Sequence, residues 1–418
     1  MGYSMAKKSK VYPTSLFWRF LTWIVFTTFS KIYNIHSIMP DEVRKLKSPY
    51  LVLGNHIGLW DPFITGNFLP RFTHFVASDA AFRSPFMRFF LTRLGAIPVK
   101  KNMRDTRVIR DIIAVIRKGH NVGIFPEGVR NWAGTSFPLD ISIAKLIKLL
   151  KVPVVSPVMK GMNLFNPRWS RKLRKARVEV HYKLLLSPEK IAELKEDEIL
   201  GILKKGIYHD EVDFQRKAMI PIRSSKKAEH ISHALYLCPE CKSIDSFTCS
   251  GNDFHCRECG YDILIDRYGF FRRKNGDKLY FDNIRDWYFW QEKYLTEHVR
   301  EKLKDKTAEP IFCDFGSQVI ISNGKVKNIK LGKADLKLYI DRILLEFEHG
   351  DSRILNFNDL KTINPQVNEE LEMYYGDEAI KVTGGRPGVS ALKWEVAMNA
   401  IWRELGQASK LSPYINSE

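Results

Sequence analysis

Residues 50–62 read Tyr-Leu-Val-Leu-Gly-Asn-His-Ile-Gly-Leu-Trp-Asp-Pro. Tyr50 to Leu53 form a short apolar run, which is typical of a buried strand. Asp61 and Pro62 are typical of a helix start, because proline is tolerated in the first helical turn. A strand that passes through a polar loop into a helix is the repeating unit of an α/β domain, whose sites lie at strand ends.

The same alternation of strands and helices continues to about residue 180. Buried strands are predicted at 122–125, 152–155 and 178–182. Apolar residues recur at helical spacing in two segments, at Val108, Ile109, Ile112, Val115 and Ile116 and at Ile141, Ala144, Ile147 and Leu150. We therefore predict an α/β domain over residues 36–215.

Three polar clusters follow predicted strands of this domain. In the first, His56 and Asp61 can meet across the loop, and an imidazole held by a carboxylate at one nitrogen can take a proton at the other. The alternative is a loop histidine and a capping aspartate that never touch. The second, residues 125–131, offers Gly128 for close backbone approach and Arg130 for phosphate binding, or is only a capping turn. The third, residues 95–101, ends in two lysines that suit a solvated strand edge equally well.

Together and in this order, the clusters resemble the glycerolipid acyltransferase family, of the 1-acylglycerol-3-phosphate O-acyltransferase (PlsC-like) type. The blocks of this family are H-x4-D, G-x-I-x-x-x-R, F-P-E-G-T-R-S and a proline-containing strand. They are matched at His56 to Asp61, at 95–101, at 125–131 and at 152–158. Lys101 replaces the usual arginine of the second block, and Val129 and Asn131 replace the usual threonine and serine of the third.

The resemblance implies an O-acyltransferase in which His56 is the general base and Asp61 orients it. It also implies that Lys101, Glu127, Gly128 and Arg130 bind the phosphate of the acceptor. The acyl donor would be a thioester, acyl-CoA or acyl-ACP (acyl carrier protein), and the default acceptor would be 1-acyl-sn-glycerol-3-phosphate. Direct transfer without an acyl-enzyme agrees with the sequence, because this half has no cysteine and no G-x-S-x-G motif.

The N-terminal segment, residues 1–35, suggests a helix at a membrane interface. Its apolar stretch runs from Phe17 to Phe29, follows Lys7, Lys8 and Lys10, and is too short to span a bilayer comfortably. A helix buried against protein is the alternative. The net charge of +19 and a basic run before residue 178 favour a polyanionic partner, while a mean hydropathy of −0.25 excludes a polytopic membrane protein. The basic run comprises Arg168, Arg171, Lys172, Arg174, Lys175 and Arg177. We expect a peripheral or monotopic protein at the cytoplasmic face of a membrane.

The second half contains a metal-binding pattern. Cys238, Cys241, Cys256 and Cys259 form C-x2-C-x14-C-x2-C, which resembles a zinc ribbon over 233–270 after a linker at 216–232. Four sulfur ligands leave no position for water, so the predicted zinc is structural, although the spacing also suits iron.

The remainder is predicted as a helical connector, 271–305, and a β-rich domain, 306–418. Seven strands are expected at 319–322, 325–329, 336–340, 343–347, 354–357, 371–375 and 380–383, with an Asn323-Gly324 turn and a final helix from Ser390. This order of elements resembles the pleckstrin-homology-like fold and suggests binding or scaffolding.

Three other functions stay open at this point. The chain could act on a different lysolipid, or it could be a catalytically impaired lipid-binding protein. Its charge, cysteines and aromatic residues also suit a nucleic-acid-binding protein, although that function leaves the ordered blocks unexplained.

Overall fold

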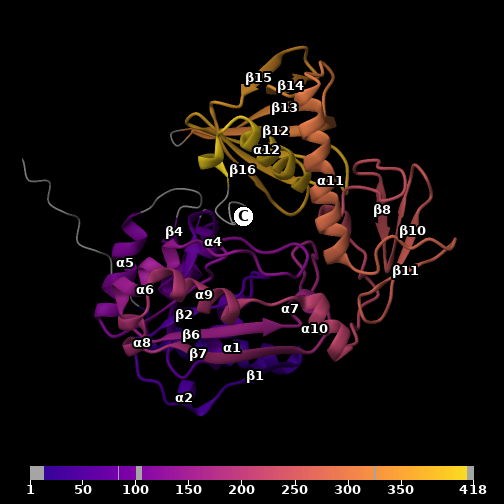
Figure 1. Cartoon of the computed structure of the whole chain (residues 1–418). Helices are drawn as coiled ribbons and strands as arrows, with labels where there is room; N and C mark the ends of the chain where they lie inside the picture. Colours follow the sequence, from indigo (N-terminus) through magenta and orange to yellow (C-terminus); the bar gives the residue numbers. More distant parts are fainter. Residues whose placement is uncertain (1–13, 83, 100–105, 324–325, 412–418) are drawn as a thin grey trace, which may run out of the picture. The chain divides into compact units, whose positions relative to one another are not determined.

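The computed structural model of the chain describes residues 14–82, 84–99, 106–323 and 326–411 (Figure 1). The chain forms two compact units. Of the described residues, those within 14–167 and 174–220 form the first unit, and those within 168–173 and 221–411 form the second. The segment from 221 to 232, expected as part of a linker, belongs to the second unit and buries residues such as Ile222, Ala228 and Ile231.

The first unit contains a seven-stranded sheet in the order β1-β7-β6-β2-β5-β3-β4. Neighbouring strands are parallel except for the antiparallel pair β6 and β7. The strands are β1 (Ile35–Ile38), β2 (Leu51–Leu53), β3 (Thr73–Ser78), β4 (Ile97–Val99), β5 (Asn121–Ile124), β6 (Val154–Lys160) and β7 (Val178–Leu186). The four strands predicted around 50, 122, 152 and 178 are present as β2, β5, β6 and β7.

Helices pack around this sheet. A core cluster joins the sheet to four of them, α5, α6, α8 and α9, and includes Val122 of β5, Val115 of α5, Ile147 of α6, Ile191 of α8 and Leu203 of α9. The two segments with helical spacing are confirmed as α5 and α6, and α3 begins at Asp61 as predicted. The helices are α1 (Leu16–Ile32), α2 (Asp41–Arg44), α3 (Asp61–Phe68), α4 (Pro85–Arg93), α5 (Thr106–Arg117), α6 (Ser142–Leu150), α7 (Met162–Phe165), α8 (Pro188–Glu193), α9 (Glu196–Ile207) and α10 (Glu211–Ala218).

Helix α1 packs one face against the protein and exposes apolar side chains on the other. Phe26 is buried and stacks on Phe63 of α3 with ring centroids 4.7 Å apart. Phe17, Phe20 and Trp23 are 64%, 60% and 53% exposed. In the described part of the chain, no helix has both the length and the apolar character needed to cross a membrane. Lys7, Lys8 and Lys10 lie outside the described residues.

The second unit begins with a small antiparallel sheet built on aromatic packing. Its strands, in the order β11-β10-β9-β8, are β8 (Phe247–Ser250), β9 (Asp253–Cys256), β10 (Asp262–Ile265) and β11 (Phe271–Arg273). Helix α11 (Ile284–Lys304) sends the fully buried Trp287 against Phe247, Phe254 and Phe271 of these strands. The aromatic residues of this helix are therefore partly core, as Trp287 and Tyr288 are, while Phe289 is half exposed.

The second unit also contains a seven-stranded antiparallel sheet followed by helix α12 (Leu392–Glu404), as the predicted element order requires. Two details of the prediction are wrong. One long strand, β13, takes up residues 326–329 and 336–338 of two strands that were predicted separately, and a strand at Leu360–Pro365 was missed. The strands are β12 (Phe312–Asn323), β13 (Val326–Leu338), β14 (Arg342–Phe347), β15 (Ser352–Asn356), β16 (Leu360–Pro365), β17 (Glu370–Tyr375) and β18 (Glu378–Thr383). Gly324 of the predicted turn lies outside the described residues.

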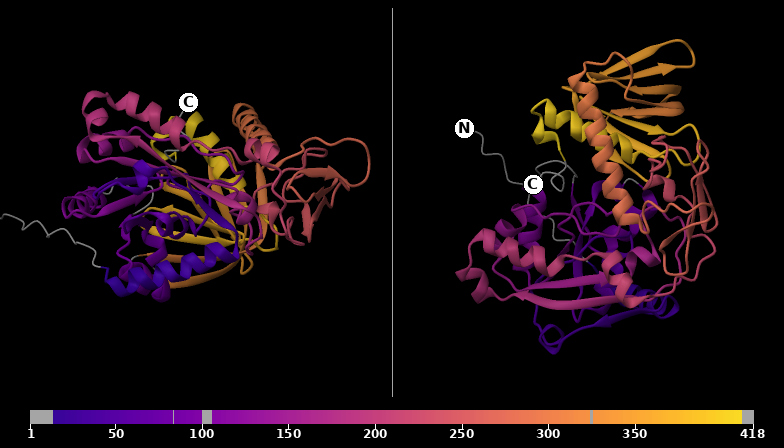
Figure 2. Two further views of the ribbon diagram at one scale, coloured as in Figure 1. Left: turned by 90° about the horizontal axis from the view of Figure 1, so that it is seen from below. Right: turned by 45° about the vertical axis from the view of Figure 1, so that its right-hand side comes forward.

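A buried ion cluster ties the small sheet to the large one within this unit. Lys393 of α12 is fully buried and donates to Asp245, which precedes β8, and to Asp314 of β12, 2.7 Å from Oδ1. Trp394 Nε1 donates to Asp314 Oδ2 at 2.7 Å. Helix α11 lies between the two sheets in Figure 1 and runs beside the large sheet in the right-hand view of Figure 2. The small and large sheets therefore share buried contacts.

Candidate active site

The candidate site lies where β2 and β5 end. These strands are parallel neighbours in the register Leu53 opposite Ile124, so the loops that follow them leave the same edge of the sheet. The β2 loop carries His56, and the β5 loop carries Glu127 and Arg130. The sheet thus brings the first and third sequence blocks together, although 71 residues separate His56 from Glu127.

Asn55 and Gly54 fasten the β2 loop to strand β6. The buried amide of Asn55 donates to the Met159 carbonyl at 3.0 Å and accepts from the Met159 N–H at 2.8 Å. A Cβ on Gly54 would lie 2.8 Å from the Pro157 carbonyl oxygen, closer than side chains allow. Met159, the residue after the predicted fourth block, therefore supports the loop that carries His56, and Pro157 of the block packs closely against it. Sequence reasoning assigned no role to Asn55.

His56 and Asp61 form a hydrogen-bonded pair, with 2.8 Å between Nδ1 and Asp61 Oδ2. Asp61 is fully buried, and its carboxylate also accepts the N–H groups of Ile57 at 2.7 Å and Gly58 at 2.9 Å. The His56 side chain is 20% exposed, so a substrate can reach it while its partner is shielded from water. The two residues therefore meet, as the H-x4-D spacing suggested.

The surroundings of Asp61 determine which tautomer of His56 is stable. A carboxylate that receives two backbone N–H groups acts as an acceptor, so the histidine donates to it from Nδ1. The neutral ring then has its lone pair on Nε2. This is the state of an imidazole that can accept a proton from a hydroxyl group.

The imidazole ring rests on an aromatic stack. Phe125 lies against His56 with centroids 4.7 Å apart and planes 19° apart, and Phe75 of β3 stacks on Phe125 at 5.7 Å. A Cβ on Gly123 would lie 2.3 Å from the Phe75 ring, so glycine is required for this packing. The stack limits the orientations that His56 can adopt.

Glu127 and Asn131 hold the backbone of His56 from both sides. Glu127 is buried, and its carboxyl group accepts the His56 N–H at 3.0 Å and the Phe137 N–H at 3.1 Å. Asn131 donates to the His56 carbonyl from its backbone N–H at 3.2 Å and from its side chain at 3.3 Å. Burial raises the pKa of Glu127 to about 8, against the opposing effect of these two N–H groups. No local sequence signal could have revealed contacts across this distance.

The other residues that the resemblance assigns to a phosphate site do not share the burial of Glu127. Arg130 is half-buried, and burial lowers the pKa of its guanidinium while the charge of Asp61 raises it. Gly128 is exposed with φ at +70°, and a Cβ there would face open space. Lys101 lies outside the described residues.

The basic run before β7 is exposed only in part: Arg168 is half-buried and Arg174 is buried, whereas the other four cations are exposed. Arg168 donates to the Pro365 carbonyl at 2.8 Å, and Arg171 pairs with Glu369 at 3.1 Å. Arg174 is buried, which lowers the pKa of its guanidinium to about 10. The expectation of a bilayer-facing run is therefore wrong for Arg174.

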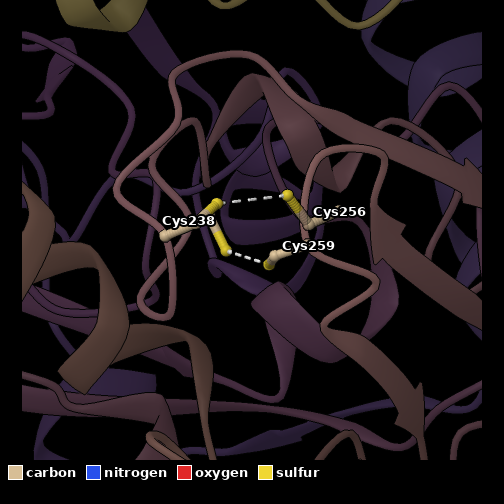
Figure 3. Close-up of side chains that lie close together, drawn as sticks. Cys238, Cys256 and Cys259 are labelled. Atoms are coloured by element: carbon tan, nitrogen blue, oxygen red, sulfur yellow. Dashed lines mark hydrogen bonds between the residues drawn. The ribbon is translucent and has the colours of Figure 1, made fainter.

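In the second unit, the four predicted cysteine ligands converge (Figure 3). The sulfur atoms of Cys238 and Cys259 are 3.7 Å apart, as are those of Cys241 and Cys256, and all four lie within 4.8 Å of one another. A tetrahedral ion with metal–sulfur bonds of about 2.3 Å has sulfur–sulfur edges of about 3.8 Å. The four thiols therefore have the spacing that a tetrahedral metal site requires.

A comparison with protein families covers the part of the chain that contains the His56 site. Residues 31–160 match the family model described as Acyltransferase. This segment is an acyltransferase-family domain. It contains the whole β2 loop with His56 and Asp61 and the whole β5 loop with Glu127 and Arg130.

The relatives of the acyltransferase domain are enzymes of one named activity. A 1-acyl-sn-glycerol-3-phosphate acyltransferase of Borreliella burgdorferi is 26% identical over 169 residues, covering 38% of this chain and 65% of that protein. One of Bacillus subtilis is 26% identical over 132 residues, covering 31% of this chain and 62% of that protein. The chain thus spans less than two thirds of either relative.

Two solved structures also overlap with the chain. The 1-acyl-sn-glycerophosphate acyltransferase PlsC of Thermotoga maritima covers 45% of this chain and 75% of its own, with 16% identity and a TM-score of 0.40. The C-terminal PH domain of the human FYVE, RhoGEF and PH domain containing protein 3 covers 23% of this chain and 90% of its own, with 9% identity and a TM-score of 0.16.

Proposed function

We propose that the chain is an O-acyltransferase that moves a fatty acyl group from an acyl thioester to the free hydroxyl of a lysophospholipid. The acceptor proposed first is 1-acyl-sn-glycerol-3-phosphate, which gives phosphatidic acid. The observation that carries the proposal is the buried Asp61 carboxylate 2.8 Å from Nδ1 of a partly exposed histidine. The family of residues 31–160 and the named activity of the relatives support it.

In the proposed reaction, His56 Nε2 takes the proton of the acceptor hydroxyl while the oxygen attacks the thioester carbonyl carbon. The carbon–sulfur bond then breaks, the ester forms, and the departing thiolate takes the proton back from His56. Asp61 keeps its charge and stabilises the imidazolium that exists between these two proton transfers. The donor is acyl-CoA or acyl-ACP, since both carry the same thioester.

We assign Glu127 and Asn131 a positioning role. The carboxyl group of Glu127 bridges two backbone N–H groups inside the domain, and Asn131 binds the His56 carbonyl. Their effect on the reaction passes through the position of His56. This differs from the resemblance, which implied phosphate binding for Glu127. Arg130, together with Lys101 and Gly128, stays the proposed phosphate site.

Membrane attachment through α1 is the proposed route to the lipid substrate. Phe17, Phe20 and Trp23 give this helix exposed apolar rings without a spanning length. The opposite face of the helix contacts the catalytic loop, because Phe29 lies 5.4 Å from Trp60 between ring centroids. A peripheral or monotopic location at the cytoplasmic face would bring His56 close to a lysophospholipid in the leaflet.

We propose that the four-cysteine site holds a structural zinc ion. The fit rests on the 3.7 Å sulfur–sulfur distances and on hydroxyl groups of Ser243 and Ser246, which lie 3.4 Å and 3.1 Å from Cys256 Sγ and can donate to it. A bound zinc would crosslink the two cysteine pairs and stabilise the small sheet. We keep a pleckstrin-homology-like fold as the proposal for the large sheet, because a four-strand and a three-strand meander join through β12 and β18 before the final helix.

The test of the proposed function is acyl transfer from a labelled acyl thioester to a panel of lysophospholipids in detergent. Both acyl-CoA and acyl-ACP are supplied, and the wild type is compared with His56→Ala. We expect His56-dependent product, with a loss of about 10²–10⁴-fold in the variant. Absence of product from folded wild-type protein with every donor and acceptor would contradict the proposal and favour a lipid-binding protein. Equal activity of His56→Ala would contradict the mechanism.

A further inference from the structure

A second group of metal-ligating side chains lies in the second unit, apart from the four cysteines. It consists of His230, His233 and Glu369, which come from two segments far apart in the sequence. One ligand atom of each lies within 4.8 Å of the others. We propose that these three residues bind a divalent transition-metal ion of the zinc class.

The two histidines are presented by one short turn. His230 stands at the start of the turn Ile231–His233, with φ at +66°, and the His233 N–H donates to the His230 carbonyl at 3.1 Å. The imidazole rings lie 5.6 Å apart between centroids with planes 22° apart. Ser390 donates to the His233 carbonyl at 2.7 Å, which fastens the turn to the segment before α12. The rings therefore face one region from a fixed backbone.

Glu369 completes the group from the residue before β17. Its Oε1 lies 2.8 Å from His233 Nε2 and accepts the Gly388 N–H at 3.1 Å. Its Oε2 accepts from Arg171 at 3.1 Å, and Arg171 belongs to the same unit. A carboxylate that is held by outer hydrogen bonds is oriented as metal-binding carboxylates are.

The donor chemistry selects the class of ion. Two imidazole nitrogens and one carboxylate oxygen form a donor set used for zinc, with a fourth position left for water or another ligand. Calcium and magnesium prefer sites made of oxygen ligands alone. His233 is buried, whereas His230 is half-buried, so an ion has a route of entry on the side of His230.

Hydrogen bonding alone leaves this group incompletely satisfied. The bond between His233 and Glu369 occupies one nitrogen of one ring. Within the described part of the chain, Nδ1 of His233 is buried and has no hydrogen-bond partner. Buried polar atoms without partners are rare in folded proteins, and those that occur often contact a bound ion or an ordered water. Because Nδ1 and Nε2 lie on different sides of the ring, an ion shared with Glu369 would bind Nε2 in place of its proton, and Nδ1 would take a separate partner such as an ordered water.

The test is metal stoichiometry of the full-length chain, purified without a histidine tag and dialysed against a zinc-containing buffer. The wild type should retain two equivalents of zinc, one in each site. His230→Ala with Glu369→Gln should retain one, and Cys238→Ser with Cys256→Ser should lose the other. His349→Ala, a change at a histidine of the same unit that is 54% exposed, is the matched control and should retain two.

The zinc equivalent that a variant retains also shows whether its second unit is folded. If His230→Ala with Glu369→Gln keeps the zinc of the four cysteines, the unit is folded and the lost ion belonged to the second site. If the wild type holds one equivalent that only the cysteine changes remove, the proposal is overturned. One equivalent that only the histidine and glutamate changes remove would support it and overturn the zinc ribbon instead.

Discussion

Replacing Asp61 by Asn is the most informative single change in the active site. The Asp61 carboxylate accepts His56 Nδ1 at 2.8 Å and the N–H groups of Ile57 and Gly58 at 2.7 Å and 2.9 Å. Asparagine keeps the shape but has one acceptor oxygen and one donor amide group. An amide N–H directed at Nδ1 stabilises the tautomer that carries its proton on Nε2. That tautomer cannot take a proton from the acceptor hydroxyl.

The expected size of the effect follows from these contacts. Loss of general-base catalysis corresponds to about 10²–10⁴-fold in rate, or about 2.7–5.4 kcal/mol at about 1.36 kcal/mol per tenfold change. In a serine protease triad, the aspartate-to-asparagine change that fixes the wrong histidine tautomer lowers kcat by roughly 10⁴-fold, which is the upper end of this range. Folding should be weakened by about 1–3 kcal/mol, because a buried N–H group loses its acceptor.

The assay is the rate of acyl transfer for Asp61→Asn, His56→Ala and the double variant, with denaturant unfolding on the same proteins. Because the two residues act as one unit, the double variant should be no slower than the slower single variant. Asp41→Asn, at an exposed first-turn position of α2, is the matched control for the chemical change. Activity of Asp61→Asn within tenfold of the wild type, or losses that multiply in the double variant, would refute the assignment of the pair.

Three further predictions follow from buried and exposed groups. Burial raises the pKa of Glu127 from 4.5 to about 8, so the native state holds a proton that the unfolded chain loses, and wild-type stability should fall as the pH rises through this window. Between pH 5 and pH 8, the unfolding free energy of Glu127→Gln should rise relative to that of the wild type by about 3–4 kcal/mol. Parallel pH profiles of the two proteins would contradict a buried carboxyl group with a raised pKa. Lys393→Met leaves two buried carboxylates without their cation and should cost about 3–5 kcal/mol of unfolding free energy, whereas Lys381→Met, at a surface pair, should cost no more than about 1 kcal/mol. Phe20→Ser with Trp23→Ser should reduce sedimentation with anionic vesicles at least tenfold while His56-dependent transfer to a soluble short-chain acceptor persists, and unchanged sedimentation would argue against α1 as the anchor.

The parts of the fold that local pattern specifies were predictable. Strand β2, its polar loop and the start of α3 at Asp61 all lie within 13 consecutive residues, and each has a local sequence signal. The H-x4-D spacing also placed His56 and Asp61 together, because both belong to the same loop. Short-range geometry therefore accounts for the contact between His56 and Asp61.

Contacts between distant segments could not be read in the same way. Glu127 reaches the His56 N–H only because β5 lies beside β2, and Asn55 reaches Met159 only because β6 lies on the other side. The residue pattern of each loop alone does not contain this information. These contacts are why we propose a positioning role for Glu127 in place of the phosphate binding that the resemblance implied.

The errors in the β-rich region have local causes. Strand β16 contains Asn364 and ends at Pro365, so it lacks the alternating apolar pattern of a strand. Strand β13 contains Gly332 at φ +111°, where the ladder with β12 changes register, and the interruption divides one strand into two apparent ones. In both places proline or glycine interrupts the alternating side-chain pattern from which a strand is predicted.

The arrangement of α1 connects the membrane proposal with the chemistry. Trp60 lies in the loop between His56 and Asp61, and its ring contacts Phe26 and Phe29 of α1 at centroid distances of 6.2 Å and 5.4 Å. The exposed apolar rings of α1 would enter one leaflet of the membrane. The loop that orients His56 would then pack against the helix that anchors the protein to the bilayer. A lysophospholipid then needs to move its headgroup only a short way from the bilayer to bring its hydroxyl to Nε2. Because Trp60 transmits this support, Trp60→Ala should impair transfer to lipid acceptors through the position of His56, even though Trp60 carries no chemistry itself.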